Sequence, residues 1–316
     1  MNVTRDDEDT EALPDAVVAH PLWRHAPAAL KPYVQLARMD RPVGWWLLLL
    51  PCWQSSALAS ASLHAAPDLR SLILFLIGAV AMRGAGSTYN DLIDRNIDAK
   101  VTRTRGRPLA SGRVSVRAAW VFIIAQCLIG LGVLLSFNLL TIALGLLSPL
   151  IVLLYPFAKR FTSWPQAILG MAFGFGGILG WTATTGTLDP PALLLYRAAI
   201  LWTIGYDTIY ALQDIADDER AGVKSTARLF GKHVKLAVGL LYAGSALLAV
   251  AAVSQAGGGL LAWSGVLAYA GHLTWQVSQT RDDLDSSTAL NLFRANRDAG
   301  LLMFAGFFAQ SLTTFS

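Results

Sequence analysis

Long apolar runs separated by short polar stretches dominate the sequence. An α-helix needs about 20 apolar residues to cross the hydrocarbon core of a bilayer, and nine runs approach that length. We predict them at 44–63, 71–90, 117–136, 139–158, 165–184, 191–213, 233–253, 258–278 and 298–315. The composition agrees, because 54% of the 316 residues are hydrophobic and only 15% are charged, far from the average of a soluble domain. The pattern predicts an all-α, polytopic integral membrane protein built as a helix bundle.

The segment before the first apolar run divides into two parts. Residues 1–30 are acidic at first and then rich in alanine, which predicts a disordered polar tail ahead of a membrane domain over 31–316. The stretch from Lys31 to Gly44 predicts an amphipathic approach helix that ends near Pro42. The tail has neither the apolar core of a secretory signal nor the Arg-rich, acid-poor character of a transit peptide. We therefore expect a bacterial cell inner membrane location.

The distribution of basic residues predicts the orientation of the bundle. With the N-terminus in the cytoplasm, the loops after the second, fourth, sixth and eighth spans are cytoplasmic, and they carry most loop lysines and arginines. The opposite loops carry only Arg70, with Arg197 nearby inside the sixth span. The bias predicts a multi-pass protein with a cytoplasmic N-terminus and an external C-terminus.

Small residues recur inside the predicted spans, for example Gly84 in the second span and Gly170 and Gly177 in the fifth. Such residues let helix backbones approach closely in lipid, which is our preferred interpretation, although they would also leave room for a ligand chain. The two cysteines, Cys52 and Cys127, lie inside apolar runs. We expect them to pack against other helices rather than to form a disulfide or a metal site.

Asn90, Asp94 and Asp98 follow the second apolar run and are spaced four residues apart. On a helix this spacing places the three side chains on one face. Carboxylates gathered in this way repel one another unless a cation lies between them. Their oxygens suit Mg²⁺, which proteins commonly bind together with substrate phosphates. Taken alone, the motif is equally compatible with a solvated helix end that carries scattered acidic residues.

A second acidic stretch favours the metal site. Asp214 and Asp218 follow the sixth apolar run, again four residues apart, and both acidic stretches lead into a basic loop that contains glycine. The recurrence indicates a weak internal repeat in which each half of the bundle supplies one acidic face. Carboxylates inside a membrane bundle are costly and are by default functional. Mg²⁺ would offset their repulsion and, with basic side chains such as Arg38 and Lys159, would bind a diphosphate.

These motifs resemble those of a known family. The sequence is similar to the membrane-embedded aromatic prenyltransferases of the UbiA superfamily, whose motif Asn-x-x-x-Asp-x-x-x-Asp is matched by Asn90, Asp94 and Asp98. The second motif, Asp-x-x-x-Asp, is matched by Asp214 and Asp218. The likeness runs from about Tyr33 onward and looks closest to the branch that prenylates 4-hydroxybenzoate in ubiquinone biosynthesis. Further matching segments are Arg38–Gly44, Arg107–Gly112, Tyr155–Arg160, Asp207–Ala211, Lys224–Gly231 and Phe293–Gly300.

The resemblance implies a nine-helix bundle whose central cavity lies on the cytoplasmic side and opens sideways to membrane lipid. It implies that four carboxylates hold the diphosphate of a polyprenyl diphosphate through Mg²⁺, namely those of Asp94, Asp98, Asp214 and Asp218. Asn90 would support the first metal ion. No nucleic-acid partner is expected.

The resemblance also assigns four substrate-binding side chains. Arg38 and Lys159 would contact diphosphate oxygens directly, and Tyr155 would orient them. Arg160 is assigned to the carboxylate of 4-hydroxybenzoate, because a guanidinium and a carboxylate pair in bidentate fashion. The alternative for Lys159 and Arg160 is a simple anchor at the cytoplasmic membrane surface.

The implied reaction is metal-assisted loss of diphosphate, attack by the ring carbon ortho to the phenol oxygen, and removal of the ring proton. Candidates for the base are Asp91, Asp207, Asp214 and the departing diphosphate. Asp91 and Asp217 are alternatively salt-bridged to the loop arginines. Competing functions are prenylation of homogentisate, a naphthoate, haem or chlorophyllide, or transport of a cation or proton, which would place the acidic residues near the midplane or along a path.

Overall fold

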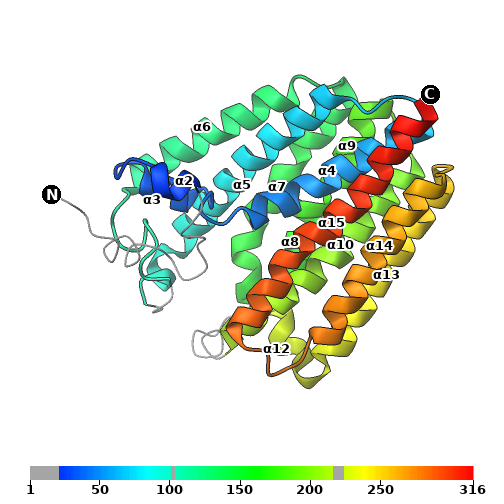
Figure 1. The fold of residues 1–316 in the computed structure, drawn as a ribbon. Helices are drawn as coiled ribbons and strands as arrows, with labels where there is room; N and C mark the ends of the chain where they lie inside the picture. Colours follow the sequence, from blue (N-terminus) through cyan, green and yellow to red (C-terminus); the bar gives the residue numbers. More distant parts are fainter. Residues whose placement is uncertain (1–20, 101–103, 216–223, 316) are drawn as a thin grey trace. The chain divides into compact units, whose positions relative to one another are not determined.

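The computed structural model describes residues 21–100, 104–215 and 224–315, and within these residues it is helical without strands. The long helices are α4 (Val43–Ser62), α5 (Leu69–Asp98), α6 (Val116–Leu134), α7 (Leu139–Phe161), α10 (Pro190–Ala211), α13 (Val234–Gln255), α14 (Leu260–Gln279) and α15 (Ser286–Phe315) (Figure 1). The shorter ones are α2 (Pro21–His25), α3 (Lys31–Leu36), α8 (Pro165–Gly174), α9 (Gly176–Thr185), α12 (Thr226–Phe230) and the 3₁₀ helices η1 (Leu212–Asp214) and η2 (Gly231–His233). The all-α prediction is confirmed.

The predicted spans fall on these helices, with the fifth divided between α8 and α9 at Phe175. Five helical segments of the described residues combine the length and the hydropathy of a membrane span: Leu69–Asp98, Val116–Leu134, Leu139–Phe161, Pro165–Thr185 and Thr226–Gln255. Helix α10 falls outside this set. It carries Arg197 and Asp207 and buries many of its side chains against other helices. The number of nine spans therefore stays a prediction.

The contacts divide the chain into two compact units, Met1–Trp45 with Ile77–Gly132 and Trp46–Leu76 with Val133–Ser316. A single membrane domain over 31–316 stays a prediction. The core of the first unit contains Leu36 of α3, Leu92 of α5 and Leu109 of the following loop. These three leucines tie the approach segment and the basic loop to the end of α5.

The last ten residues of the predicted disordered tail differ from that prediction. Residues Pro21–His25 form α2, and the Trp23 side chain is 1% exposed. The Lys31 ammonium lies 5.2 Å from the centre of the Trp23 ring, a distance typical of a cation–π contact. Because a buried tryptophan contributes a large apolar area, this part of the tail is ordered, while residues 1–20 lie outside the described part.

Helix α10 is the centre of the second unit, where it packs against α8, α9, α13 and α15. Glycines make the close approach possible. A Cβ atom at Gly170 would lie 2.9 Å from the Ile200 carbonyl oxygen, and one at Gly177 would lie 2.9 Å from the Tyr196 nitrogen. Because these contacts are with backbone atoms, the packing interpretation of the glycines in the fifth span is confirmed.

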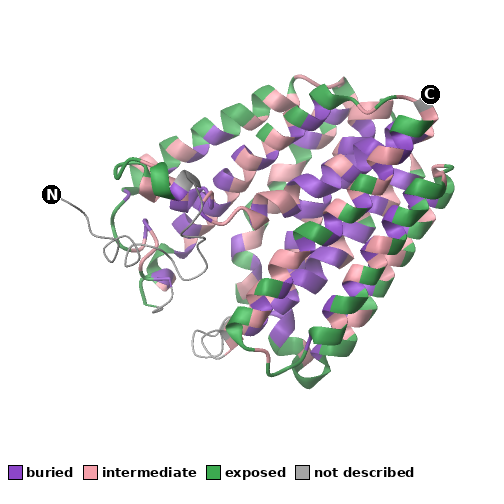
Figure 2. Ribbon diagram, in the orientation of Figure 1, coloured by how far each residue is buried: buried purple, intermediate pink, exposed green. Residues whose placement is uncertain are grey.

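A buried hydrogen-bond network joins four helices of the second unit. The Trp202 Nε1 of α10 donates to Asn296 Oδ1 of α15 at 2.7 Å. Asn296 Nδ2 and the Tyr242 hydroxyl both donate to Gln276 Oε1, at 2.9 and 3.1 Å. Exposed residues, in contrast, recur along α13 and α14 (Figure 2). Polar groups thus lie inside this unit, and large apolar side chains face outward as expected for lipid contact.

Candidate active site at the end of helix α5

The residues of the first acidic stretch lie on a helix, as predicted. Helix α5 continues from Leu69 through Asp98 without a break. Asn90 is half-buried, whereas Asp94 is 1% and Asp98 is 7% exposed. The sequence therefore places three oxygen-bearing side chains along successive turns of one helix end, and two of them are withdrawn from bulk water.

The approach segment differs from its prediction. Helix α3 ends at Leu36, well before Pro42, and Arg38 has a φ of 56°, in the left-handed region that is uncommon for residues other than glycine. The hydroxyls of Ser87 and Thr88 on α5 donate to the Leu36 carbonyl oxygen at 2.7 and 3.4 Å. These side-chain contacts hold the buried C-terminal end of α3 at the point where the chain turns, a tertiary effect that hydrophobic periodicity does not reveal.

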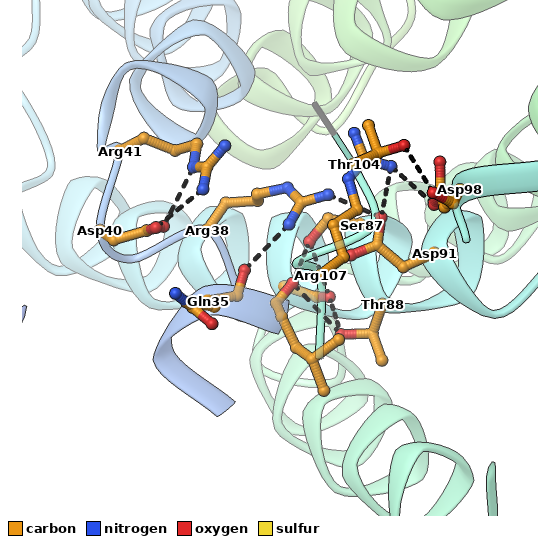
Figure 3. Close-up of polar contacts among 12 residues, drawn as sticks. Gln35, Arg38, Asp40, Arg41, Ser87, Thr88, Asp91, Asp98, Thr104 and Arg107 are labelled. Atoms are coloured by element: carbon orange, nitrogen blue, oxygen red, sulfur yellow. Dashed lines mark hydrogen bonds and ion pairs between the residues drawn. The ribbon is translucent and has the colours of Figure 1, made fainter. Parts of the chain in front are cut away.

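The turn directs Arg38 toward α5 (Figure 3). Its Nη2 donates to Asp91 Oδ1 at 2.6 Å, and its Nη1 donates to the Gln35 carbonyl oxygen at 3.0 Å. Arg38 is 7% exposed. The partner of Arg38 in this structure is thus a carboxylate of the protein, and its predicted contact with diphosphate oxygens stays a prediction.

Asp91 is the centre of the charged cluster. Its side chain is fully buried, and its Oδ1 also accepts from Arg107 Nη1 at 3.1 Å. The same Nη1 donates to Asp98 Oδ2 at 2.9 Å, so Arg107 bridges two carboxylates of α5 (Figure 3). The predicted alternative of an ion pair between Asp91 and a loop arginine is thus present, and a role of Asp91 as base stays a prediction.

Arg107 is a site residue for which the sequence offers little signal. It begins the matching segment Arg107–Gly112 and lies in a basic loop with several other arginines. The loop is folded against α5, because the Thr104 hydroxyl donates to the Asp98 carbonyl oxygen at 3.1 Å. It also holds the approach segment, because Arg113 Nη2 donates to Gln35 Oε1 at 2.8 Å.

The helix end has the chemistry of a site for a hard divalent cation. The atoms with which Asn90, Asp94 and Asp98 can bind a metal ion are oxygens, the ligands that Mg²⁺ prefers. Asp98 Oδ2 already accepts a hydrogen bond from the Arg107 guanidinium. Among the described residues, no three acidic, histidine or cysteine side chains gather closely enough to hold a metal ion. The further predicted ligands, the side chain of Asp214 and all of Asp218, lie outside the described part.

The second acidic stretch begins differently. Helix α10 ends at Ala211, and Leu212–Asp214 form the 3₁₀ helix η1. Asp214 is thus the last residue of a 3₁₀ turn, which has a tighter repeat than an α-helix, and the predicted face of Asp214 and Asp218 stays a prediction. Asp217, like Asp218, lies outside the described residues.

The predicted substrate-binding side chains of the second unit lie at the end of α7. Tyr155 and Lys159 are half-buried there and Arg160 is exposed. The Arg160 guanidinium lies over the Phe157 ring, 5.5 Å from its centre. The Lys159 carbonyl oxygen accepts from the Lys224 backbone nitrogen at 3.1 Å. The assigned roles of these residues stay predictions.

The segment Lys224–Gly231 is anchored by its hydroxyl groups. The Thr226 hydroxyl and that of Thr208 on α10 lie 2.6 Å apart, and the Thr226 backbone nitrogen donates to Gln166 Oε1 of α8 at 3.1 Å. Ser225 accepts a capping hydrogen bond from Arg228 at the start of α12. The second basic loop is thus attached to the ends of α7, α8 and α10.

A family model described as the UbiA prenyltransferase family matches residues 48–297. The chain is 44% identical to "4-hydroxybenzoate polyprenyltransferase, mitochondrial" of Mus musculus, over 89% of this chain and 75% of the mouse protein. It is 42% identical to the protein of the same name from Arabidopsis thaliana, over 95% of this chain and 74% of the plant protein. The resemblance drawn from the motifs is therefore confirmed.

Solved structures agree on the fold. A UbiA homolog from Aeropyrum pernix K1 superposes with a TM-score of 0.70 at 29% identity and covers 84% of this chain and 97% of its own. A UbiA homolog from Archaeoglobus fulgidus bound to GPP and Mg²⁺ superposes with a TM-score of 0.67 at 22% identity, covering 90% and 99%. Both comparisons support the membrane helix bundle.

The expected bacterial cell inner membrane location is wrong by these comparisons, because the similar relatives are named as mitochondrial proteins. The expectation rested on the missing transit-peptide pattern in residues 1–30. The absence of such a pattern carries no information about the compartment.

Proposed function

Because the chain belongs to the UbiA prenyltransferase family, we propose that it transfers a polyprenyl group from polyprenyl diphosphate to 4-hydroxybenzoate, in ubiquinone biosynthesis. The group joins the ring carbon ortho to the hydroxyl, and the ring proton leaves. The relatives' names support this acceptor. The observation that carries the proposal is the buried cluster at the end of α5, where arginines and carboxylates of the matched motifs meet.

We assign Asn90, Asp94 and Asp98, together with Asp214 and Asp218, to the binding of Mg²⁺. When bound, Mg²⁺ neutralises the charge that develops on the leaving diphosphate. The protein's part is to hold oxygen donors at fixed positions on α5, away from bulk water. Two features support this assignment, namely the unbroken helix through Asp98 and the low exposure of Asp94 and Asp98.

We assign Arg38, Lys159 and Tyr155 to the diphosphate of the prenyl substrate. The Arg38 guanidinium is held by Asp91 and by the Gln35 carbonyl oxygen, and Asp91 follows Asn90 directly on α5, so the charge of Arg38 lies beside the carboxylates that we assign to Mg²⁺. Asp91 then acts as a positioning residue, because its Oδ1 is shared by Arg38 and Arg107. A long apolar prenyl tail requires contact with membrane lipid, which we include as a partner.

We assign Arg160 to the carboxylate of 4-hydroxybenzoate. A neutral phenol needs no guanidinium, whereas a benzoate entering a partly dry site does. The Arg160 guanidinium lies over the Phe157 ring, and Arg160 is exposed, so a carboxylate can approach it from solvent. The charge of the acceptor would thus be recognised by a residue separate from the diphosphate ligands.

The proposal is tested with membranes that contain the overexpressed chain and one radiolabelled prenyl diphosphate. Product is expected with 4-hydroxybenzoate and Mg²⁺, and none after chelation of divalent metal. Homogentisate and a dihydroxynaphthoate serve as competing acceptors, and membranes without the chain provide the background. Preferred transfer to either competing acceptor would overturn the assigned acceptor while leaving the prenyltransferase family intact.

A further inference from the structure

A groove of about 440 Å³ lies between the start of α13 and the end of α14, both in the second unit. The two helices lie side by side (Figure 1). The basic part of the lining consists of Lys232, His233 and Lys235. The apolar part includes Leu236, Leu240 and Val277. None of these residues belongs to the proposed active site, so the groove is a separate feature of the molecule.

The lining follows the helical repeat. Lys235 and Gly239 are four residues apart, as are Leu236 and Leu240, so the two pairs form adjacent rows along one side of α13. The charged positions come first and the apolar positions follow, and Leu236 and Leu240 are 63% and 65% exposed. A Cβ atom at Gly239 would lie 3.5 Å from Val277 Cγ1, so a larger side chain there would occupy the groove. The groove thus has a cationic mouth and an apolar floor.

The basic residues of the mouth lie where η2 runs directly into α13. Lys232 and His233 belong to η2, and Lys235 lies in the first turn of α13, which contains no acidic residue. Lys235 Nζ donates to the Ser278 carbonyl oxygen at 3.3 Å, which orients this lysine across the groove toward α14.

We propose that the groove binds an anionic phospholipid, with the phosphodiester at Lys232 and Lys235 and an acyl chain along Leu236 and Leu240. Residues 232–240 rise by about 12 Å on a helix, close to the roughly 15 Å depth of one leaflet's hydrocarbon layer. A zwitterionic headgroup would bring a cationic amine against the lysines. Basic pockets between membrane helices bind anionic headgroups by the same complementarity.

Lipid retention on the purified full-length chain tests the proposal. The protein is equilibrated with vesicles of equal phosphatidylcholine and phosphatidylglycerol, and the bound lipid is counted by native mass spectrometry. The wild type is expected to retain phosphatidylglycerol, and Lys235→Gln to lower its affinity by about fivefold. Arg281→Gln is the matched control, because Arg281 is exposed just after the end of α14 and does not line the groove.

A second pair of variants tests the apolar floor without changing charge. Gly239→Leu is expected to lower phosphatidylglycerol retention severalfold, and Gly239→Ala to leave it near the wild-type level. Equal losses in Lys235→Gln and Arg281→Gln would mean diffuse attraction at the surface and would overturn the site. Displacement of the lipid by inorganic phosphate or farnesyl diphosphate at matched concentration would also overturn it, by assigning the mouth to a different anion.

Discussion

The two acidic stretches share a four-residue spacing, but the helices that carry them end differently. Helix α5 runs beyond the predicted end of its span at residue 90 and continues to Asp98. Helix α10 ends at Ala211 and gives way to η1. The first residues of the two stretches therefore differ in local structure, Asn90 inside an α-helix and Asp214 in a 3₁₀ turn, because each helix end depends on the contacts that satisfy its last carbonyl groups.

The surroundings explain the difference. At the end of α5, Arg107 and Thr104 of the following loop fold back onto Asp98 and its carbonyl oxygen. At the end of α10, the described contacts of the following basic loop include the hydroxyl pair of Thr208 with Thr226 and the Lys224 ammonium, which donates to the Phe161 carbonyl oxygen at 3.3 Å. The first stretch is thus compensated by an arginine of the loop that follows it, whereas residues 216–223 after the second lie outside the described part. The comparison sets a charge-compensated helix end against one whose described loop contacts go to hydroxyl, amide and carbonyl oxygens.

The largest expected effect comes from removing one proposed metal ligand from either acidic stretch. Asp94→Ala and Asp218→Ala are each expected to lower turnover by at least about 100-fold, the magnitude seen when a group that stabilises developing charge is removed. Expression and thermal stability serve as controls for folding. Near-normal turnover of Asp218→Ala at saturating Mg²⁺, with loss only in Asp94→Ala, would restrict the metal site to the face on α5.

The next effect tests the charge compensation itself. Asp91→Ala leaves Arg38 and Arg107 without their shared carboxylate, and breaking a buried ion pair costs about 3–5 kcal/mol. We expect a clear fall in the unfolding temperature of the purified protein in detergent. Asp298→Ala is the control, because its pair with Arg297 is exposed and such pairs contribute about 0–1 kcal/mol. Equal shifts in both variants would show that the cluster contributes no more than a surface pair.

A smaller effect concerns Mg²⁺ affinity. Arg107 occupies Asp98 Oδ2, and a charge-assisted hydrogen bond contributes about 1.5–3 kcal/mol, so Arg107→Gln should tighten Mg²⁺ binding by about tenfold. Calorimetry on the metal-free protein measures this. Arg113→Gln is the control, because it removes the same charge from the same loop. Arg113 donates to Gln35 and Gly106 instead of a carboxylate, so the Mg²⁺ affinity of this variant should stay close to that of the wild type. Weaker Mg²⁺ binding in Arg107→Gln would mean that Arg107 supports the metal site instead of competing with Mg²⁺ for Asp98.

The smallest effect concerns the acceptor. Arg160→Ala should raise the apparent KM for 4-hydroxybenzoate severalfold and that for the prenyl diphosphate much less, because water reaches the exposed guanidinium and weakens each contact. Arg160→Lys should recover part of the loss, since an ammonium cannot pair in bidentate fashion. Steady-state kinetics with each substrate varied in turn give both values. Equal rises in the two KM values would place Arg160 at the diphosphate. Unchanged KM values would mean that Arg160 is a membrane-surface anchor.

Much of the fold follows from sequence because membrane helices are long and apolar, so the predicted spans fall on helices of the structure. The face of Asn90, Asp94 and Asp98 follows equally directly from spacing. The turn at Arg38 does not, because it depends on hydroxyls of Ser87 and Thr88 on a distant segment.

The hydrophobic pattern of the sequence also cannot predict the bridge from Arg107 to two carboxylates. Its partners, Asp91 and Asp98, become neighbours of the guanidinium only once the loop folds back. Charge patterns in the sequence indicated that arginines and acids would meet here. Only the three-dimensional contacts identify which carboxylate oxygen each guanidinium nitrogen reaches.

The backbone-to-backbone packing of α8 and α9 on α10 has a mechanical consequence. With Gly170 and Gly177 against carbonyl and amide atoms of α10, no flexible side chains separate these helices, and sliding one past another would drive backbone atoms into each other. We therefore expect α8, α9 and α10 to move as one stiff element during a catalytic cycle. Hydrogen exchange should be slow throughout this element, and any opening that admits a long substrate must be hinged at its ends.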